Sequence, residues 1–112
     1  MWVFTVDGFF SAVEAKGGGL MIRARFRSDL EHLIKRGMAD KIVDTPQADY
    51  PFRVIVTKKA WAKYMADSAM AIDYPNFKGK ALARASWDRS ERYHRVWADM
   101  AEPCKEPERF RY

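Results

Sequence analysis

Three arginines at alternate positions are the feature of this sequence best suited to binding. Arg23, Arg25 and Arg27 alternate with apolar residues in the segment 20–27. In a β-strand, alternate side chains lie on one face, about 6.6 Å apart at twice the rise per residue. Successive phosphates of an extended nucleic acid have a similar spacing. The pattern therefore predicts a basic sheet face for a phosphate backbone, with Arg53 joining from a neighbouring strand.

The same arginines also fit a purely structural role. The outer face of a half-buried antiparallel sheet is normally polar, and arginine protects an exposed sheet edge against aggregation. Phe10 or Met21 is expected to offer stacking surface beside the arginines. The segment lacks the alternating Phe and Tyr of RNA-binding sheets, which speaks against sequence-specific recognition of RNA.

Few residues are candidates for catalysis. His32, His94 and Cys104 are the only side chains that by type titrate near neutral pH. The histidines lack the i, i+4 spacing of a metal-binding pair, and a single cysteine excludes a disulfide within the chain. We therefore expect surface or boundary roles for all three, and assign no catalytic residue, no metal ligand and no cofactor.

Three aspartates that border turns form the remaining candidate for metal chemistry. Asp44, Asp49 and Asp73 would suit magnesium if the fold gathered them, which keeps a metal-dependent nucleotide or phosphodiester enzyme open as a third function. Turn aspartates more often accept hydrogen bonds from their own backbone. The glycines at 17–19 predict a flexible hairpin loop, because three glycines in a row cost backbone entropy that a regular element does not tolerate. They are not expected to bind phosphate, because no Lys-Ser or Lys-Thr follows them as in a phosphate-binding loop.

Periodicity and turn signals predict the elements that position these residues. Strands are expected at residues 2–5, 9–14, 20–27, 41–44 and 52–56, and helices at 29–36, 58–72 and 76–100. Residues 28–31 have the form of a capping box, so the first helix is expected to begin at Asp29, while Thr57 and Asn76 cap the others. A hairpin followed by a helix occurs twice. This predicts an α+β fold: an antiparallel sheet of four to five strands with two helices on one face, ferredoxin-like or a similar ββα-ββα sandwich, plus a C-terminal helix.

Length and composition indicate one small domain. A chain of 112 residues supports a single core, so we expect one α+β domain at 1–101 and a frayed tail at 102–112. No apolar run approaches the roughly 20 residues needed to span a bilayer, and the first residues lack the charged region of a signal peptide. A cytoplasmic location without membrane contact is expected. The formal charge of +5 favours polyanionic partners.

The predicted last helix offers a second basic surface. Its basic residues are Lys78, Lys80, Arg84, Arg89, Arg92 and Arg95. Acidic residues stand three or four positions from several of them, as in the pair Glu91 and Arg95, so a solvated face with internal ion pairs is expected. Tyr74 and Trp87 are the exposed aromatic residues expected to contact a protein partner.

Several short motifs resemble a family of short uncharacterised bacterial and phage proteins. They lie at residues 1–5 (MWVFT), 8–11 (GFFS), 44–50 (DTPQADY), 72–78 (IDYPNFK) and 93–97 (YHRVW). The resemblance implies a common small fold in a cytoplasmic setting, on mobile elements, and carries over no activity. The glycine insert and the tail after Met100 depart from the family pattern.

Two hypotheses of function follow. The first is a non-enzymatic small binding protein that contacts nucleic acid or a nucleoprotein complex through a basic sheet face bearing Arg23, Arg25, Arg27 and Arg53. The alternative is a phage- or prophage-type interaction protein that docks on a host protein or defence complex, as an anti-CRISPR-like inhibitor does. Pairing of two copies through an exposed sheet edge, giving a homodimer, stays open in both cases.

Overall fold

The computed structural model describes residues 1–82 and 87–102 of the 112-residue chain. The chain divides into two compact units, Met1–Asp73 and Tyr74–Tyr112, where the sequence predicted one domain over residues 1–101. Of the tail expected at 102–112, only Glu102 belongs to the described residues.

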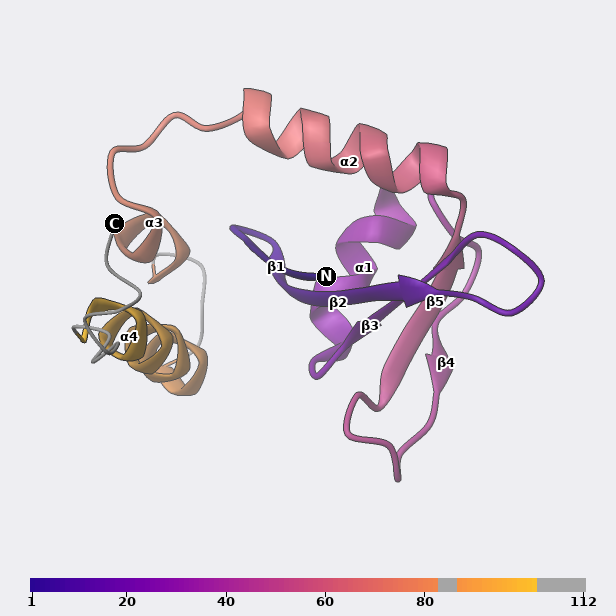
Figure 1. Cartoon of the computed structure of the whole chain (residues 1–112), viewed down its shortest axis with the longest axis horizontal. Coiled ribbons are helices and arrows are strands. Elements are labelled where there is room, and N and C mark those ends of the chain that lie inside the picture. Colours follow the sequence, from indigo (N-terminus) through magenta and orange to yellow (C-terminus); the bar gives the residue numbers. More distant parts are fainter. Residues whose placement is uncertain (83–86, 103–112) are drawn as a thin grey trace, which may run out of the picture. The chain divides into compact units, whose positions relative to one another are not determined.

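The first unit contains one antiparallel sheet. Its strands are β1 (Trp2–Thr5), β2 (Gly8–Glu14), β3 (Leu20–Ala24), β4 (Val43–Asp44) and β5 (Phe52–Val56), and their spatial order is β1-β2-β3-β5-β4 (Figure 1). Helix α1 (Arg27–Lys35) follows β3, and α2 (Lys58–Met70) follows β5. The predicted α+β class and the repeat of hairpin and helix are confirmed.

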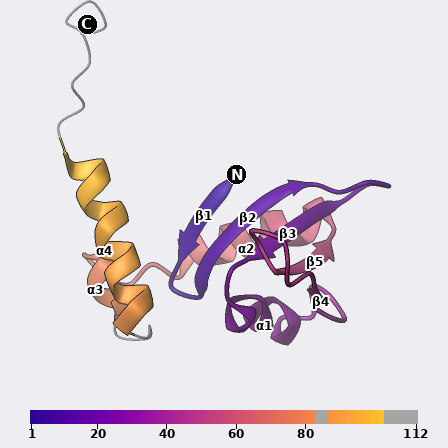
Figure 2. The same cartoon turned by 90° about the horizontal axis from the view of Figure 1, so that it is seen from below.

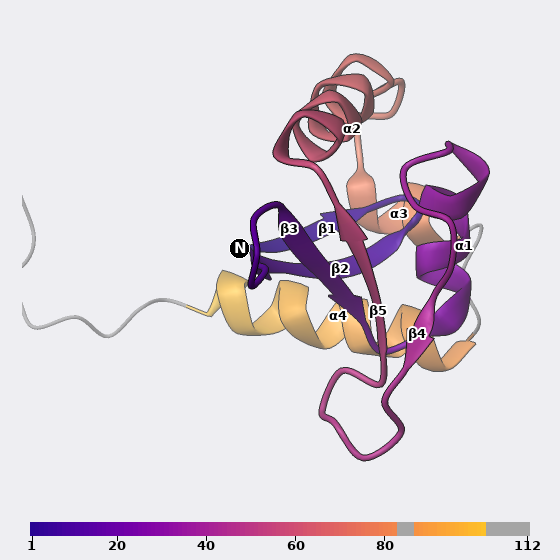
Figure 3. The same ribbon diagram turned by 90° about the vertical axis from the view of Figure 1, so that its right-hand side faces the viewer.

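The core lies between one face of this sheet and both helices. Ile22 of β3 pairs with Ala12 on one side and Val54 on the other, so these side chains share a face. The buried cluster comprises Phe10, Ala12, Ile22, Ala24, Val54 and Val56 from the sheet, Leu30 and Leu33 from α1, and Trp61 and Tyr64 from α2. Because both helices contribute to one cluster, they pack against the same face, as predicted, and Figure 3 shows them beside the sheet. The opposite face of the sheet is called the outer face below.

The passage from β3 to α1 differs from the sequence expectation. The strand expected to continue to residue 27 ends at Ala24, and α1 begins at Arg27 instead of Asp29. Phe26 is the N-cap, without a side-chain hydrogen bond. Ser28, the expected cap, therefore lies inside the helix instead of before it. The neighbouring Asp29 is 1% exposed, and its carboxylate accepts a tertiary hydrogen bond from the backbone N–H of Phe9 at 3.2 Å. The local capping signal is thus not used.

The cap of α2 is the one predicted. The hydroxyl of Thr57 accepts a hydrogen bond from the backbone N–H of Ala60 at 3.0 Å, which satisfies one of the free donors of the first turn.

The second unit contains α3 (Phe77–Leu82) and α4 (Trp87–Ala101), where the sequence predicted one helix over residues 76–100. Asn76 caps α3, since its side chain accepts a hydrogen bond from the N–H of Gly79 at 3.2 Å. Figure 2 shows α4 alongside α3, and the rings of Phe77 and Tyr93 stack between them with centroids 6.2 Å apart. Within residues 1–82 and 87–102, no helix has both the length and the apolar character that crossing a bilayer requires.

Candidate nucleic-acid interface

Two of the predicted arginines meet on the outer face of the sheet. The strand register sets Arg23 of β3 directly opposite Arg53 of β5, and Ser11 of β2 opposite Arg23 on its other side. The hydroxyl of Ser11 accepts a hydrogen bond from Arg23 Nη2 at 2.8 Å. Since Arg23 alternates with core residues Ile22 and Ala24, its side chain lies on the face away from the helices.

Tyr50, in the segment before β5, organises these arginines. The guanidinium carbons of Arg23 and Arg25 lie 4.6 Å and 4.8 Å from the centroid of its ring. Arg53 Nη2 donates to the carbonyl oxygen of Tyr50 at 3.4 Å, while its Nη1 lies 3.6 Å from the sulfur of Met21. Tyr50 is only 4% exposed, so its ring packs under the guanidinium groups, between them and the interior of the protein. Arg23, Arg25, Arg53 and Tyr50 are called the arginine cluster below.

The arginine cluster carries charge that the described residues leave uncompensated. In the described part of the chain, no carboxylate lies within 4.0 Å of the guanidinium nitrogens of Arg23, Arg25 or Arg53. The Nε atoms of Arg23 and Arg53 are buried and have no hydrogen-bond partner among those same residues. Like charges directly opposite each other on neighbouring strands destabilise a sheet. An anion between the two guanidiniums would relieve this repulsion.

Arg27 does not belong to the arginine cluster. It begins α1, because the strand ends three residues earlier. Its Nη1 lies 2.8 Å from Asp44 Oδ1, and its Nε lies 3.9 Å from Glu31 Oε1. The alternation that predicted three arginines in one row is thus wrong for Arg27, whose charge is compensated by carboxylates of this chain.

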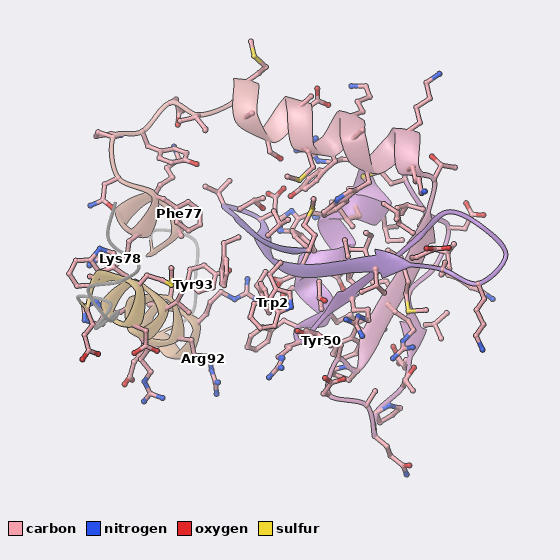
Figure 4. All side chains as sticks on the ribbon, in the orientation of Figure 1. Trp2, Tyr50, Phe77, Lys78, Arg92 and Tyr93 are labelled. Carbon is pink, nitrogen blue, oxygen red and sulfur yellow. The ribbon has the colours of Figure 1, made fainter. Side chains whose placement is uncertain are left out.

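Aromatic rings adjoin the arginines on the same face. The register places Phe4 of β1 opposite Phe9 of β2, and the two rings stack with centroids 4.6 Å apart. Phe9 also contacts Trp2 edge-on at 6.1 Å and Tyr50 at 6.3 Å. Figure 4 labels Trp2 and Tyr50, the two ends of this series of ring contacts. Trp2 is 72% exposed. The series Trp2, Phe4 and Phe9 is called the aromatic strip below.

The aromatic strip corrects the expectation that Phe10 offers the stacking surface, and it provides aromatic residues, which the segment 20–27 lacks. Phe10, expected beside the arginines, is 0% exposed and packs in the core against Trp61 and Tyr64. Phe9 takes its place on the outer face. Met21 does lie there, half-buried beside Arg53.

Two buried contacts hold the hairpin that carries the aromatic strip. Asp29 of α1 binds the backbone N–H of Phe9, as described above, and Gly8 leaves room for its carboxylate. At the turn, the hydroxyl of Tyr64 donates to Asp7 Oδ2 at 2.9 Å and lies 2.9 Å from the hydroxyl of Thr5. Since the single proton of Tyr64 goes to Asp7, the Thr5 hydroxyl donates to the oxygen of Tyr64. Both helices therefore fix the hairpin from the core side.

The hydroxyl of Tyr64 makes stability sensitive to alkaline pH. Burial raises the pKa of Tyr64 to about 12, while the hydrogen bond from Thr5 lowers it and the charge of Asp7 raises it. A tyrosine in the unfolded chain ionises near pH 10, so stability that is present below pH 10 is lost as the pH rises toward 12. We expect Tyr64→Phe to be less stable than the wild type by about 1 kcal/mol at pH 7, because the hydrogen bonds of the hydroxyl are missing. Between pH 10 and 12, the free energy of unfolding of the variant should fall less than that of the wild type. Urea unfolding at each pH measures both effects.

Tyr74→Phe is the matched control for this prediction, because it makes the same change at a half-buried tyrosine of the second unit. Parallel stability curves for Tyr64→Phe and the wild type up to pH 12 would show that this hydroxyl has no part in the alkaline loss.

One histidine occupies a boundary position and the other a surface position. His32 is half-buried, and its Nδ1 lies 3.6 Å from Asp7 Oδ1. His94 is exposed and stacks on Trp97 with centroids 5.5 Å apart. Cys104 lies outside the described residues.

Two of the turn aspartates serve separate contacts. Asp44 pairs with Arg27, and Asp49 accepts a hydrogen bond from the N–H of Tyr50 at 2.9 Å. Residues 1–82 and 87–102 contain no group of three or more His, Cys, Asp or Glu that is arranged to hold a metal ion. The carboxylate cluster considered for magnesium, which also included Asp73, is therefore not formed.

The residues expected to contact a protein partner belong to the second unit. Tyr74 is half-buried, with its ring 6.2 Å from that of Phe77. Trp87 begins α4, and its side chain lies outside the described residues. The predicted ion pair of α4 is confirmed, since Arg95 Nη2 lies 2.9 Å from Glu91 Oε1. No family model, no curated protein and no solved structure matches the chain.

Proposed function

We propose that this protein is a non-enzymatic, cytoplasmic binding protein that contacts nucleic acid through the outer face of its sheet. The observation that carries the proposal is the facing pair of Arg23 and Arg53, reinforced by Arg25, without a carboxylate partner in the described part of the chain. Guanidinium groups bind phosphate oxygens through two parallel hydrogen bonds. A phosphate backbone supplies such oxygens in a row.

The arginine cluster is arranged for binding before any ligand arrives. Arg23 is held by Ser11 and by the ring of Tyr50, and Arg53 by the carbonyl of Tyr50. Side chains that are already ordered lose less conformational entropy when they bind. This ordering favours a binding surface over a face that merely keeps the sheet soluble, whose arginines would extend freely into water.

The salt dependence of binding tests the proposal. We expect a fluorescein-labelled 12-nucleotide single strand to bind in fluorescence anisotropy titrations. Its logarithmic affinity should fall with the logarithm of salt concentration at a slope of about −2, because three arginines each release roughly 0.7 counterions on a single strand. An absence of binding at 25 mM salt, or an affinity that salt does not change, would refute the proposal.

A second candidate is docking on a host protein, and α4 favours it. Val96, Trp97 and Met100 of this helix are 41%, 54% and 82% exposed, and exposed apolar residues on one element are typical of protein interfaces. A pull-down from nuclease-treated host lysate separates the candidates. A partner that is retained after nuclease treatment and lost in a Trp97→Ala, Met100→Ala variant would favour protein docking over the proposed function.

A further inference from the structure

We infer that the nucleic acid bound at the outer face is single-stranded, with an unpaired base stacked on Trp2. This inference rests on the proposed function and adds the class of ligand. The arginine cluster by itself recognises phosphates, which single strands and duplexes share. The aromatic strip distinguishes them.

Trp2 offers an accessible ring on a fixed backbone. The side chain is 72% exposed. Its backbone lies between two hydrogen-bonded positions, because Met1 N donates to the carbonyl oxygen of Ala12 at 2.9 Å and Ala12 N donates to that of Met1 at 2.8 Å, while Val3 pairs with Phe10. The backbone pairing with β2 thus extends to Met1 and fixes the backbone of Trp2 on both sides. An exposed indole held in this way costs little entropy when a base stacks on it.

The exposed ring is linked to the cations through contacts on a single face. Trp2 contacts Phe9, Phe9 contacts Tyr50, and the ring of Tyr50 carries Arg23 and Arg25. One extended strand can therefore place a base on Trp2 and phosphates further along the same strand on the guanidiniums. Alternation of stacking surface and positive charge is the usual arrangement of proteins that bind single strands.

A duplex does not fit this arrangement. Its bases are stacked on each other, and its grooves admit a helix or a narrow β-ribbon, whereas Trp2 and Phe9 lie on the surface of a sheet. An exposed indole would meet a duplex only at its sugar–phosphate surface, where stacking contributes nothing. Every unpaired base has a free aromatic face, so we expect binding to tolerate any sequence.

Three ligands of equal length test the inference on the wild-type protein. They are a 12-nucleotide single strand, an abasic 12-unit strand with the same phosphates, and a 12-base-pair duplex. We expect the single strand to bind about tenfold more tightly than the abasic strand, because stacking of one base on an aromatic side chain typically changes affinity by this order. DNA and RNA strands of the same length show which sugar is preferred.

The Trp2→Ala variant assigns the difference to this ring. It should bind the single strand as weakly as the abasic strand, and its affinity for the abasic strand should equal that of the wild type. Trp2→Phe should keep most of the preference, and Trp97→Ala, which removes an exposed indole of the second unit, should leave it unchanged. These comparisons also detect misfolding, since a misfolded variant would lose its affinity for the abasic strand as well.

The outcomes separate the two proposals. If single strand, abasic strand and duplex bind with equal affinity and the same salt dependence, the phosphate-binding function stands and the inference fails. The inference also fails if Trp2→Ala keeps the wild-type preference for the single strand over the abasic strand. Its affinity for the abasic strand must be normal in that case, which shows that the variant is folded. If none of the three binds at 25 mM salt, both proposals fail.

Discussion

The Arg23→Gln, Arg53→Gln double variant is expected to bind the 12-nucleotide single strand about 100-fold more weakly than the wild type at 50 mM salt. Each guanidinium provides a charge-assisted contact to phosphate, and such contacts are worth roughly 1.5–3 kcal/mol in a desolvated setting and less at a surface. The salt slope should also fall by about 1.4, since two counterion-releasing contacts are removed. Anisotropy titrations at four salt concentrations measure both quantities.

Lys58→Gln, Lys59→Gln is the matched control. It removes the same two charges from exposed positions at the start of α2, a helix that packs on the opposite face of the sheet. We expect this variant to lose less than fivefold in affinity. Equal losses in the two variants would mean that net charge, and not the arginine cluster, determines binding.

The arginine variant should fold about as stably as the wild type. Removing both charges ends the repulsion between directly opposed strand residues, which offsets the loss of the hydrogen bonds to Ser11 and to the carbonyl oxygen of Tyr50. A melting temperature close to that of the wild type therefore accompanies the loss of affinity. A clear drop in melting temperature would indicate that the arginines have a structural role instead.

Gly8→Ala is expected to destabilise the first unit by about 3 kcal/mol. A β-carbon at this position would overlap the carboxyl group of Asp29, which has no free space because it is buried in the core. Moving Asp29 away would break its hydrogen bond with the N–H of Phe9. Overpacking and loss of a buried polar contact are among the few mechanisms that give effects of this size. Urea unfolding followed by circular dichroism measures the change.

Two further variants isolate the cause of this effect. Gly18→Ala changes a glycine with φ +100° whose β-carbon would meet open space, so it should cost only about 1 kcal/mol of backbone strain. Adding Asp29→Ala to Gly8→Ala should cost less than the sum of the single changes, because the two groups compete for one space. Additive losses would show that contact with Asp29 is not what requires glycine at position 8.

Much of the fold was predictable because its local signals agree. The strands near residues 2–5, 9–14 and 52–56 have alternating or β-branched residues between clear turns, and Thr57 caps α2 as expected. The end of β3 was not predictable in this way. Alternation continues through Arg25 and Arg27 in the sequence, but β3 ends at Ala24, and α1 begins at Arg27 and brings Asp29 into contact with the N–H of Phe9. Only tertiary structure contains that information.

The candidate site was predicted in part. Alternation placed Arg23 on the outer face, and the register brings Arg53 opposite to it. Tyr50 was missed, because it reaches Arg23 and Arg25 from a loop distant in sequence. The aromatic strip left a usable signal: a two-residue turn after Thr5 sets Phe4 opposite Phe9, and that register puts both rings on one face.

Nuclear magnetic resonance mapping tests the central claim most directly. On titration of isotope-labelled protein with the 12-nucleotide single strand, we expect the largest changes at the Nε–H signals of Arg23 and Arg53 and at the backbone amides of Ser11 and its neighbours in β2, β3 and β5. Changes confined to Arg92 and Arg95 of α4, with the signals of β3 and β5 unmoved, would contradict binding at the outer face of the sheet.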